Sequence, residues 1–447
     1  MASDQAVTAQ PAGAGEPAEP KGVLSNRDFA KLWTGETISE AGTQVTQFAM
    51  PLVAVLTLRA SVFQVGVLNA LKFVPVISVA LFAGVWLDRR RRRPVMIACA
   101  LGNAVLIALV PIASVTGLLS MGLLYVVTAL AGSLTVVFDV GALSYVPFLV
   151  SREQLPDANG KLQASSAVAG IAGPGLAGLL VGLITAPITL SVDAVSYLFS
   201  AAGMAVITKP EDAPQSSGER VSIRQSISEG FHAVYGTKIL RILLAQSTAL
   251  NVGFGAVSTV FLVYAVRDLH LTPFKLGIVT AALAVGALLG ALLAARIKRT
   301  LGLGRAMGAS ILGVSLSPLL LLIPRDAGPA AIVILIAGWL GHGAGISVWN
   351  VNTITLRQAV TPARLLARMN ATYRMLLFGA LPAGALAGGL VGSIAGLRTA
   401  MIISVLALTT PLFWLVFSPV FRLREMPHGP FSESSADTPQ TPGTPPE

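Results

Sequence analysis

Hydrophobic residues in this chain form long blocks separated by short polar stretches. A helix that crosses a bilayer needs about 20 mainly apolar residues, because it rises about 1.5 Å per residue through a hydrocarbon core about 30 Å thick. Twelve such blocks follow one another, and the longest polar interruption lies between the sixth and the seventh. The pattern predicts an all-α membrane protein with twelve transmembrane helices in two pseudo-symmetric six-helix bundles. The predicted spans are about 30–57, 64–87, 94–113, 119–147, 159–183, 187–207, 240–265, 274–295, 306–323, 329–355, 368–393 and 397–421.

The polar stretches divide the chain into five parts. Residues 1–25 are rich in alanine, proline and glycine, and residues 425–447 are rich in proline, serine and threonine, so we expect two disordered cytoplasmic tails. Residues 26–207 and 239–424 would form the N-terminal and C-terminal six-helix bundles, joined by a cytoplasmic linker at 208–238. The first tail has no apolar core after a basic start, which argues against a cleaved signal peptide.

The composition supports placement in lipid. Hydrophobic residues make up 54% of the chain and charged residues 12%, whereas soluble domains carry about 25% charged residues. The net charge of +10 does not indicate nucleic-acid binding, because the basic residues lie in short gaps between apolar blocks and not on a water-facing scaffold. Cys99 is the only cysteine, which excludes a disulfide framework and a zinc or redox pair.

Basic residues are unevenly distributed between alternate gaps. With the N-terminus placed inside, the cytoplasmic segments carry 25 lysines and arginines and the outer segments carry 5. Basic residues in short loops resist translocation. We therefore expect a multi-pass protein of the cytoplasmic (inner) membrane with both termini in the cytoplasm, and the five arginines at 89–93 would anchor one inner loop.

The two halves resemble each other in sequence. The stretch "GPGLAGLLVG" at 173–182 lies 210 residues before "AGALAGGLVG" at 383–392, and six residues repeat in place. At a spacing of 211, Asp139 aligns with Asn350 and Asn159 with Asn370. Repeated membrane halves commonly hold a substrate site between them near the midplane. The repeat therefore favours a carrier over a static anchor.

Several motifs are similar to those of the major facilitator superfamily. "GVWLDRRRRRPVMI" at 84–97 resembles the family's G-x-L-x-D-R-x-G-R-R loop between its second and third helices, and "VAGIAGPGLAG" resembles the antiporter motif G-P-x-x-G-G. Over about residues 26–425 the chain resembles the bacterial drug- and siderophore-exporter branch, which includes macrolide-efflux and enterobactin-exporter relatives. The loop motif is carried by Gly84, Asp88, Arg89, Arg92 and Arg93, and the antiporter motif by Gly170, Gly173, Pro174 and Gly178.

The resemblance implies a charged latch in the first half. In the family, an acid at the inner end of the fourth helix completes an Asp–Arg–Asp cluster, here Asp88, Arg92 and Asp139. Asp88 and Arg92 are four residues apart, and a carboxylate is stabilised near a helix N-terminus. We interpret the three as a latch that favours the outward-facing state; a solvated ion pair of almost no energetic weight is the alternative. Ala294 and Asn350 replace both acids in the second half, so only the first half would have the latch.

A polar stripe in the first span is the candidate proton and cavity site. Ionisable groups at membrane depth are costly and normally face a cavity or a partner. The depth of Lys72 in the second span suggests a Glu40–Lys72 pair, with Glu36 or Glu40 accepting the coupling proton; alternatively, Glu36 lies in shallow cytoplasmic water and the pair is structural. The stripe consists of Glu36, Glu40, Gln44 and Gln47.

Two further titratable residues lie within predicted spans, Asp193 and His342. A histidine can change protonation near neutral pH, although a lone histidine among glycines is typical of hydrogen-bonded packing. Pro174 removes a helical hydrogen bond and would bend the fifth span around a central cavity, while the adjacent small residues also suit plain close packing.

These features favour a proton-coupled exporter of bulky, largely apolar molecules such as antibiotics, siderophores or other secondary metabolites. A nutrient importer is the alternative within transport, and a membrane scaffold is the alternative from another class. The chain has no Walker-type, H-E-x-x-H or G-x-S-x-G motif, so we expect neither an ATPase nor a hydrolase. The expected partners are the bilayer, the substrate and protons, with no nucleic acid, metal or cofactor, and the expected state is a monomer.

Overall fold

The computed structural model describes residues 22–87, 89–211 and 223–413. In these ranges each predicted span coincides with one helix or with a short series of helices. Most of the first predicted tail, all of the second and residues 212–222 of the predicted linker lie outside the described residues. The first half contains α1 (Arg27–Leu52), α2 (Val62–Leu71), α3 (Val74–Ser78), α4 (Ala80–Leu87), α5 (Arg92–Val115), α6 (Met121–Leu149), α7 (Leu155–Ile184) and α8 (Ala186–Ala205). The remainder is α9 (Ile223–Gly236), α10 (Lys238–Arg267), α11 (Pro273–Leu301), α12 (Leu303–Leu316), α13 (Pro329–Val360), α14 (Leu366–Ala395) and α15 (Leu397–Thr409).

Side-chain caps fix where several helices begin. The Asn26 side chain accepts hydrogen bonds from the first backbone amides of α1, and Ser61 forms a reciprocal capping box with Gln64 at α2. The Thr272 side chain caps α11, and Pro273, which needs no amide partner, takes its first position. Local sequence therefore sets these boundaries before any tertiary contact forms.

The second predicted span is not one continuous helix. It is divided into α2, α3 and α4, with the first break at Lys72 and Phe73. Pro75 lies in the first turn of α3, where its missing amide is tolerated, but it cannot donate the bond that would continue α2. Lys72 is the C-cap of α2 and keeps helical backbone angles.

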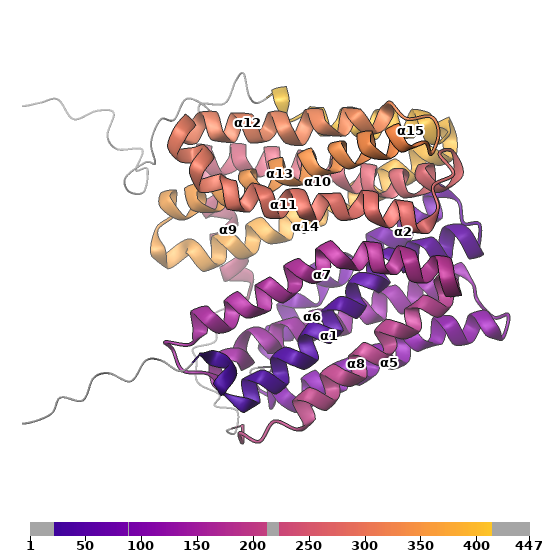
Figure 1. The fold of residues 1–447 in the computed structure, drawn as a ribbon. Helices are drawn as coiled ribbons and strands as arrows, with labels where there is room; N and C mark the ends of the chain where they lie inside the picture. Colours follow the sequence, from indigo (N-terminus) through magenta and orange to yellow (C-terminus); the bar gives the residue numbers. More distant parts are fainter. Residues whose placement is uncertain (1–21, 88, 212–222, 414–447) are drawn as a thin grey trace, which may run out of the picture.

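The helices form two bodies that lie side by side. In Figure 1, α10–α15 make up the upper body and α1 with α5–α8 the lower one, while α7 runs along the boundary between them. Nine helices in the described part of the chain are long and apolar enough to cross a membrane. Large apolar side chains on the outside, such as Leu143 at 76%, Leu183 at 71% and Ile394 at 77% exposure, suit contact with lipid and not with water.

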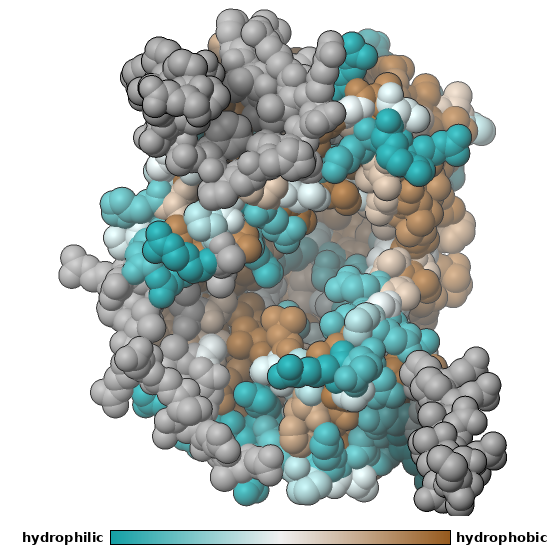
Figure 2. All heavy atoms as spheres, turned by 90° about the vertical axis from the view of Figure 1, so that its left-hand side faces the viewer, coloured by the Kyte–Doolittle hydropathy of each residue, from teal (hydrophilic) through white to brown (hydrophobic). Residues whose placement is uncertain are grey.

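The two bodies touch at one end and separate at the other. Contacts between them are made by α7 with α11 and by α2 with α14, near the loops at 58–61 and 268–272. These loops lie across the molecule from residue 22, because α1 and α10 each run the full depth between the two sides. Seen from the side of residue 22, the surface is hollowed between the bodies, with apolar residues inside the recess (Figure 2). The protein is therefore open on the side of residue 22 and closed on the other.

Candidate functional site

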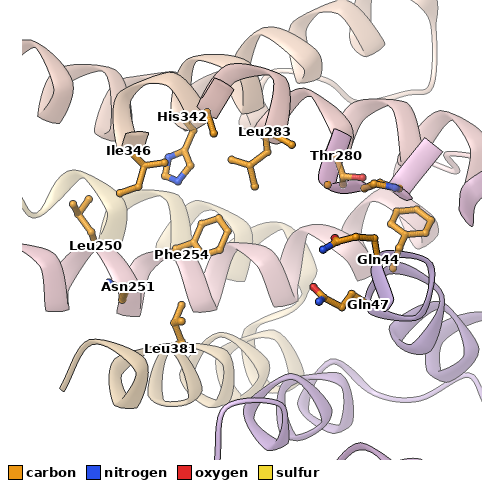
Figure 3. A pocket seen from close by; sticks show the side chains of 15 residues that line it. Gln44, Gln47, Leu250, Asn251, Phe254, Thr280, Leu283, His342, Ile346 and Leu381 are labelled. Atoms are coloured by element: carbon orange, nitrogen blue, oxygen red, sulfur yellow. The ribbon is translucent and has the colours of Figure 1, made fainter. Parts of the chain in front are cut away.

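A cavity of about 610 Å³ lies where the two bodies meet. Its size falls within the range of small-molecule pockets, about 300–1,000 Å³. Figure 3 shows side chains from both halves pointing into it, with Gln44 and Gln47 opposite Thr280 and Phe254. The lining residues are Gln44, Gln47, Phe48, Gly170, Pro174, Leu250, Asn251, Phe254, Thr280, Leu283, Ala284, Ala287, His342, Ile346 and Leu381. The wall is mostly apolar and aromatic, and its polar groups are neutral amides, a hydroxyl and one imidazole.

The polar stripe of α1 runs into this cavity. The Gln44 amide donates to Oε1 of Glu40 at 2.9 Å, and the Ser166 hydroxyl of α7 donates to the same oxygen at 3.1 Å. One turn earlier, the Ser200 hydroxyl of α8 donates to Glu36 at 2.7 Å. The ion pairs found among the described residues include neither carboxylate. Gln44 thus links a cavity wall to an acid that has no cationic partner within the described part of the chain.

Lys72 does not meet Glu40. Its Nζ lies 3.4 Å from the backbone carbonyl of Gln47, and no ion pair joins Lys72 to Glu40 among the described residues. The predicted pair was based on depth counts in a core about 30 Å thick, whereas the helical residues 27–57 that carry Glu40 extend over about 45 Å. Gln47 is seven residues beyond Glu40, or about 10 Å further along α1. The lysine is therefore held nearer the closed end than the expected pair requires.

Asp193 lies outside the cavity, in the interface between α8 and α1. Its carboxylate is 1% exposed and accepts the Ser196 hydroxyl at 3.0 Å. A Cβ at Gly42 of α1 would overlap Ser196 and press on Asp193, so the glycine allows the two helices to approach. Thr46 also interacts with Asp193, although neither Thr46 Oγ1 nor Asp193 Oδ2 reaches hydrogen-bond geometry. The structure gives this acid a place in helix packing and no direct access to the cavity.

His342 lines the cavity and is also part of the packing of the second half. Its ring stacks on Phe254 at 5.5 Å, and Nδ1 lies 2.9 Å from the carbonyl of Val314. A carbonyl can only accept, so Nδ1 is the donor and Nε2 is the nitrogen that a ligand can reach. His342 thus has the hydrogen-bonded packing that was one of its alternatives, and its ring also forms part of the cavity wall.

The arginines of the predicted loop motif are bound within the first half. The Glu211 carboxylate accepts the backbone amides of Arg92 at 2.7 Å and Arg93 at 3.1 Å, and it therefore caps the N-terminus of α5. The Arg92 side chain donates to the carbonyl of Ser144, while Arg93 donates to the last carbonyls of α8. No sequence motif indicated Glu211, which lies in the stretch predicted to be a linker.

The predicted latch is not assembled among the described residues. Asp88 lies outside them, and Asp139 is exposed on α6, where it interacts electrostatically with Glu36 and Glu40. No ion pair between Asp139 and Arg92 is present in the described part. The other two members of the motif are Gly84, within α4, and Arg89, in the turn after α4; a Cβ at Gly84 would meet nothing.

The antiporter motif forms the seam between the two halves. A Cβ at Gly173 would overlap Gln44 of α1, and a Cβ at Gly178 would overlap the carbonyl of Pro273 on α11. In return, a Cβ at Gly277 of α11 would overlap the carbonyl of Pro174. Gly170 has open space and lines the cavity. α7 is one helix through Pro174, and its glycines allow close packing against α1 at Gly173 and across the seam at Gly178.

Two glycines at the contacts between the halves were not predicted, because no motif lies near them. Gly277 lies where α11 meets α7, and Gly66 lies where α2 meets α14. A Cβ at Gly66 of α2 would press on the backbone of Ala385 in α14, and Gly389 approaches Val62 in the same way. Glycine inside an apolar span was the available signal, but the sequence has too many such glycines to single these out.

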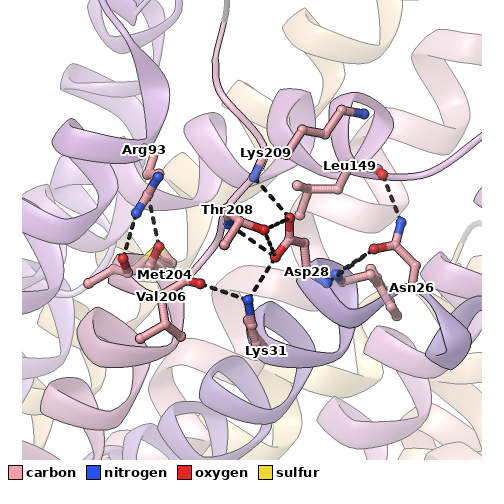
Figure 4. Close-up of polar contacts among 11 residues, drawn as sticks. Asn26, Asp28, Lys31, Arg93, Leu149, Met204, Val206, Thr208 and Lys209 are labelled. Atoms are coloured by element: carbon pink, nitrogen blue, oxygen red, sulfur yellow. Dashed lines mark hydrogen bonds and ion pairs between the residues drawn. The ribbon is translucent and has the colours of Figure 1, made fainter.

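A polar cluster holds the helix ends on the open side of the first half. Asp28 accepts from Lys31 Nζ at 2.9 Å and from the backbone amides of Thr208 at 3.1 Å and Lys209 at 2.9 Å (Figure 4). Burial raises the pKa of Asp28, but these hydrogen bonds outweigh it and lower the pKa to about 2. The cluster joins the start of α1 to the segment that leaves α8.

Lipid-facing helices in two bodies, with a cavity shared between them and open to one side, define a multi-pass membrane transporter of the major facilitator fold. The chain belongs to the transmembrane secretion effector family, whose model matches residues 19–440. It is a transporter of a small-molecule substrate and not an enzyme.

Comparisons with individual proteins agree with this class. The chain is 27% identical over 417 residues to the multidrug efflux pump Tap of Mycolicibacterium fortuitum, covering 89% of this chain and 95% of the relative. Its fold is similar to the nucleoside transporter NupG, with a TM-score of 0.73 and 13% identity over 89% of this chain and 99% of the other. It is also similar to a bacterial homologue of the iron transporter ferroportin in its inward-facing state, with a TM-score of 0.66 and 18% identity over 90% of this chain and 99% of the other.

Proposed function

We propose that this protein exports bulky, largely apolar small molecules by alternating access and draws on the proton gradient. The observation that carries the proposal is the cavity of about 610 Å³ between the halves, apolar over most of its wall and in contact through Gln44 with the carboxylate of Glu40. An apolar cavity with a few polar anchors suits such ligands. The similarity to a protein named a multidrug efflux pump supports the same substrate class.

Glu40 is the residue we assign to proton exchange, with Glu36 beside it. Ser166 and Gln44 both donate to one oxygen of Glu40, and donors of this kind favour the ionised carboxylate. The ionised Glu40 carboxylate holds Gln44 in place at the cavity wall, where a bound substrate contacts it. Protonation of Glu40 weakens this hold and so disfavours bound substrate, as exchange of substrate for protons requires. Binding and protonation are thereby linked through one side chain.

The proposed orientation gives the described state a place in an export cycle. The distribution of lysine and arginine supports a cytoplasmic location for residue 22, and the cleft opens on that side. The described state is then inward-facing, the state in which an exporter takes up its cargo. Closing this side would bring α4 and α5 toward α14. We assign the Asp88–Arg92–Asp139 latch to that opposite state, with no charged counterpart in the second half.

Everted membrane vesicles test the proposal. Vesicles from cells that overproduce the chain should accumulate antibiotics or dyes from a screen when the lumen is acidified, and a protonophore should stop the accumulation. Vesicles without the protein are the control. If none of the compounds accumulates, while intact cells take up a nutrient in a proton-dependent way, the importer alternative is correct and the exporter proposal fails.

A further inference from the structure

We propose that an anionic phospholipid binds in a groove between α1 and α8, on the lipid-facing side of the first half. The groove has a volume of about 600 Å³, and its open end carries Arg27 and Lys31. In this arrangement the phosphate of the head group lies at the two cations, and one acyl chain lies along the helices below them. The site is separate from the central cavity, with which it shares no lining residue, and it does not depend on the direction or the coupling of transport.

Small residues make the floor of the groove. Gly35 of α1 faces the backbone of Phe199 and Ser200, and a Cβ at Gly203 of α8 would press on the carbonyl of Lys31. The two backbones therefore lie close together and leave a channel above them. Phe199, at 53% exposure, and Val206, at 55%, stand at its sides. Such a channel offers van der Waals contact along an acyl chain without a competing side chain in its path.

The length of the groove matches one leaflet of a bilayer. Arg27 and Ile38, at its two ends, are eleven residues apart on one helix. This corresponds to about 16 Å of helical rise, and half of a hydrocarbon core is about 15 Å. A groove with cations at one end and apolar walls over this distance has the dimensions and polarity of one lipid molecule.

The charges at the open end favour an anion. The Arg27 side chain is exposed, and no hydrogen bond or ion pair to it is found within the described residues. Asp28 is the acid beside the groove, and it is already engaged by Lys31, Thr208 and Lys209. It therefore does not compete for Arg27. The Lys31 Nζ, held by Asp28 and by the carbonyl of Val206, is fixed at the edge of the groove.

Native mass spectrometry of the purified full-length protein tests the site. The protein is mixed with phosphatidylglycerol or with phosphatidylcholine of identical acyl chains, and the bound lipid is counted. We expect phosphatidylglycerol to bind more tightly to the wild type. Arg27→Gln should weaken this binding about fivefold, the factor that corresponds to about 1 kcal/mol per cation at a membrane surface. Ala202→Trp, which fills the groove and leaves the charges in place, should weaken both lipids.

Arg299→Gln is the matched control, because Arg299 is an exposed arginine at the end of α11 on the same side of the protein and outside the groove. It should bind phosphatidylglycerol like the wild type. Equal binding of the two lipids by the wild type would overturn the proposal, and so would equal losses in Arg27→Gln and Arg299→Gln. Undiminished lipid binding by a folded Ala202→Trp variant would overturn it as well.

Discussion

The two halves of this transporter have similar helices but different chemistry. The acids at membrane depth in the described part, Glu36, Glu40, Asp139 and Asp193, all belong to the first half. The helices of the second half contribute neutral and aromatic groups to the cavity, including Phe254, His342 and Thr280. A duplicated scaffold thus carries its intramembrane acids in one half, whereas both halves contribute to the cavity wall. Under the proposed function, a change in the second half should therefore alter substrate binding without altering the acids.

In each half, a residue at an equivalent position binds the segment that precedes the first long helix of that half. In the first half, Asp157 at the start of α7 accepts the backbone amide of Val23, just before α1. In the second half, Arg368 at the start of α14 pairs with Glu229 of α9, just before α10. Positions 157 and 368 are 211 apart, the spacing of the sequence repeat. The two contacts therefore lie at equivalent positions of the repeat, but the residue there is acidic in the first half and basic in the second.

The largest effect is expected from an acid of the first half. Glu40→Gln keeps a polar side chain but removes the titratable group, so gradient-driven accumulation in everted vesicles should fall to the level of vesicles without the protein. Binding of the same compound to the purified variant should persist. Glu153→Gln, at an exposed acid in the loop before α7, is the control and should transport normally. Normal transport by Glu40→Gln would contradict the proposal that the acids of the first half carry out proton exchange.

A substitution at the seam between α7 and α11 should change the equilibrium between the described state, open on the side of residue 22, and the state that is open on the other side. In Gly277→Leu the new side chain overlaps the carbonyl of Pro174, and overpacking of this kind costs about 1–3 kcal/mol, or roughly tenfold in the population of the state that contains the contact. A cysteine at Thr280 should then react faster with an impermeant maleimide added from the closed side. Gly175→Leu is the matched control, since a Cβ at Gly175 meets nothing. Equal labelling rates in the two variants would contradict the role assigned to the seam.

His342 of the second half should affect binding and not coupling. His342→Phe retains a ring for stacking on Phe254 but loses the bond to Val314 and the nitrogen that faces the cavity. One hydrogen bond has a net value of about 1 kcal/mol, so substrate affinity should fall about fivefold with the proton dependence of transport unchanged. Equilibrium binding at two pH values checks this result. A loss of gradient dependence in His342→Phe would place coupling in the second half as well.

The smallest effect is expected from Asp28, which joins the start of α1 to the segment after α8. The pKa of Asp28 is lowered to about 2 in the folded protein, so the stability it contributes is present above its ordinary pKa and is lost as the pH falls toward 2. Asp28→Asn should therefore be less stable than the wild type at about pH 6, and the difference should shrink between about pH 4 and about pH 2. Thermal unfolding in detergent across this range measures it. A difference in stability between Asp28→Asn and the wild type that does not change with pH would contradict the lowered pKa of Asp28.

The positions of the helices could be read from the sequence because each depends on local hydrophobicity and on caps such as Ser61 and Thr272. The Gln44 and Gln47 side chains line the cavity, and residues three apart on one helix share a face. Lys72 was expected at the depth of Glu40 but reaches the backbone of Gln47. The depth count took the first span as about 30 Å long, whereas residues 27–57 are helical over about 45 Å.

By itself, the sequence determined that this is a membrane protein of two related halves, because burial of apolar surface in lipid requires long apolar helices and a repeat remains visible in the residues. Only the tertiary structure decided which residues meet. Glu211 caps α5 from 119 positions away, and Gly277 adjoins Pro174 across the seam. Such contacts depend on the relative placement of distant helices, for which neither periodicity nor composition carries a signal.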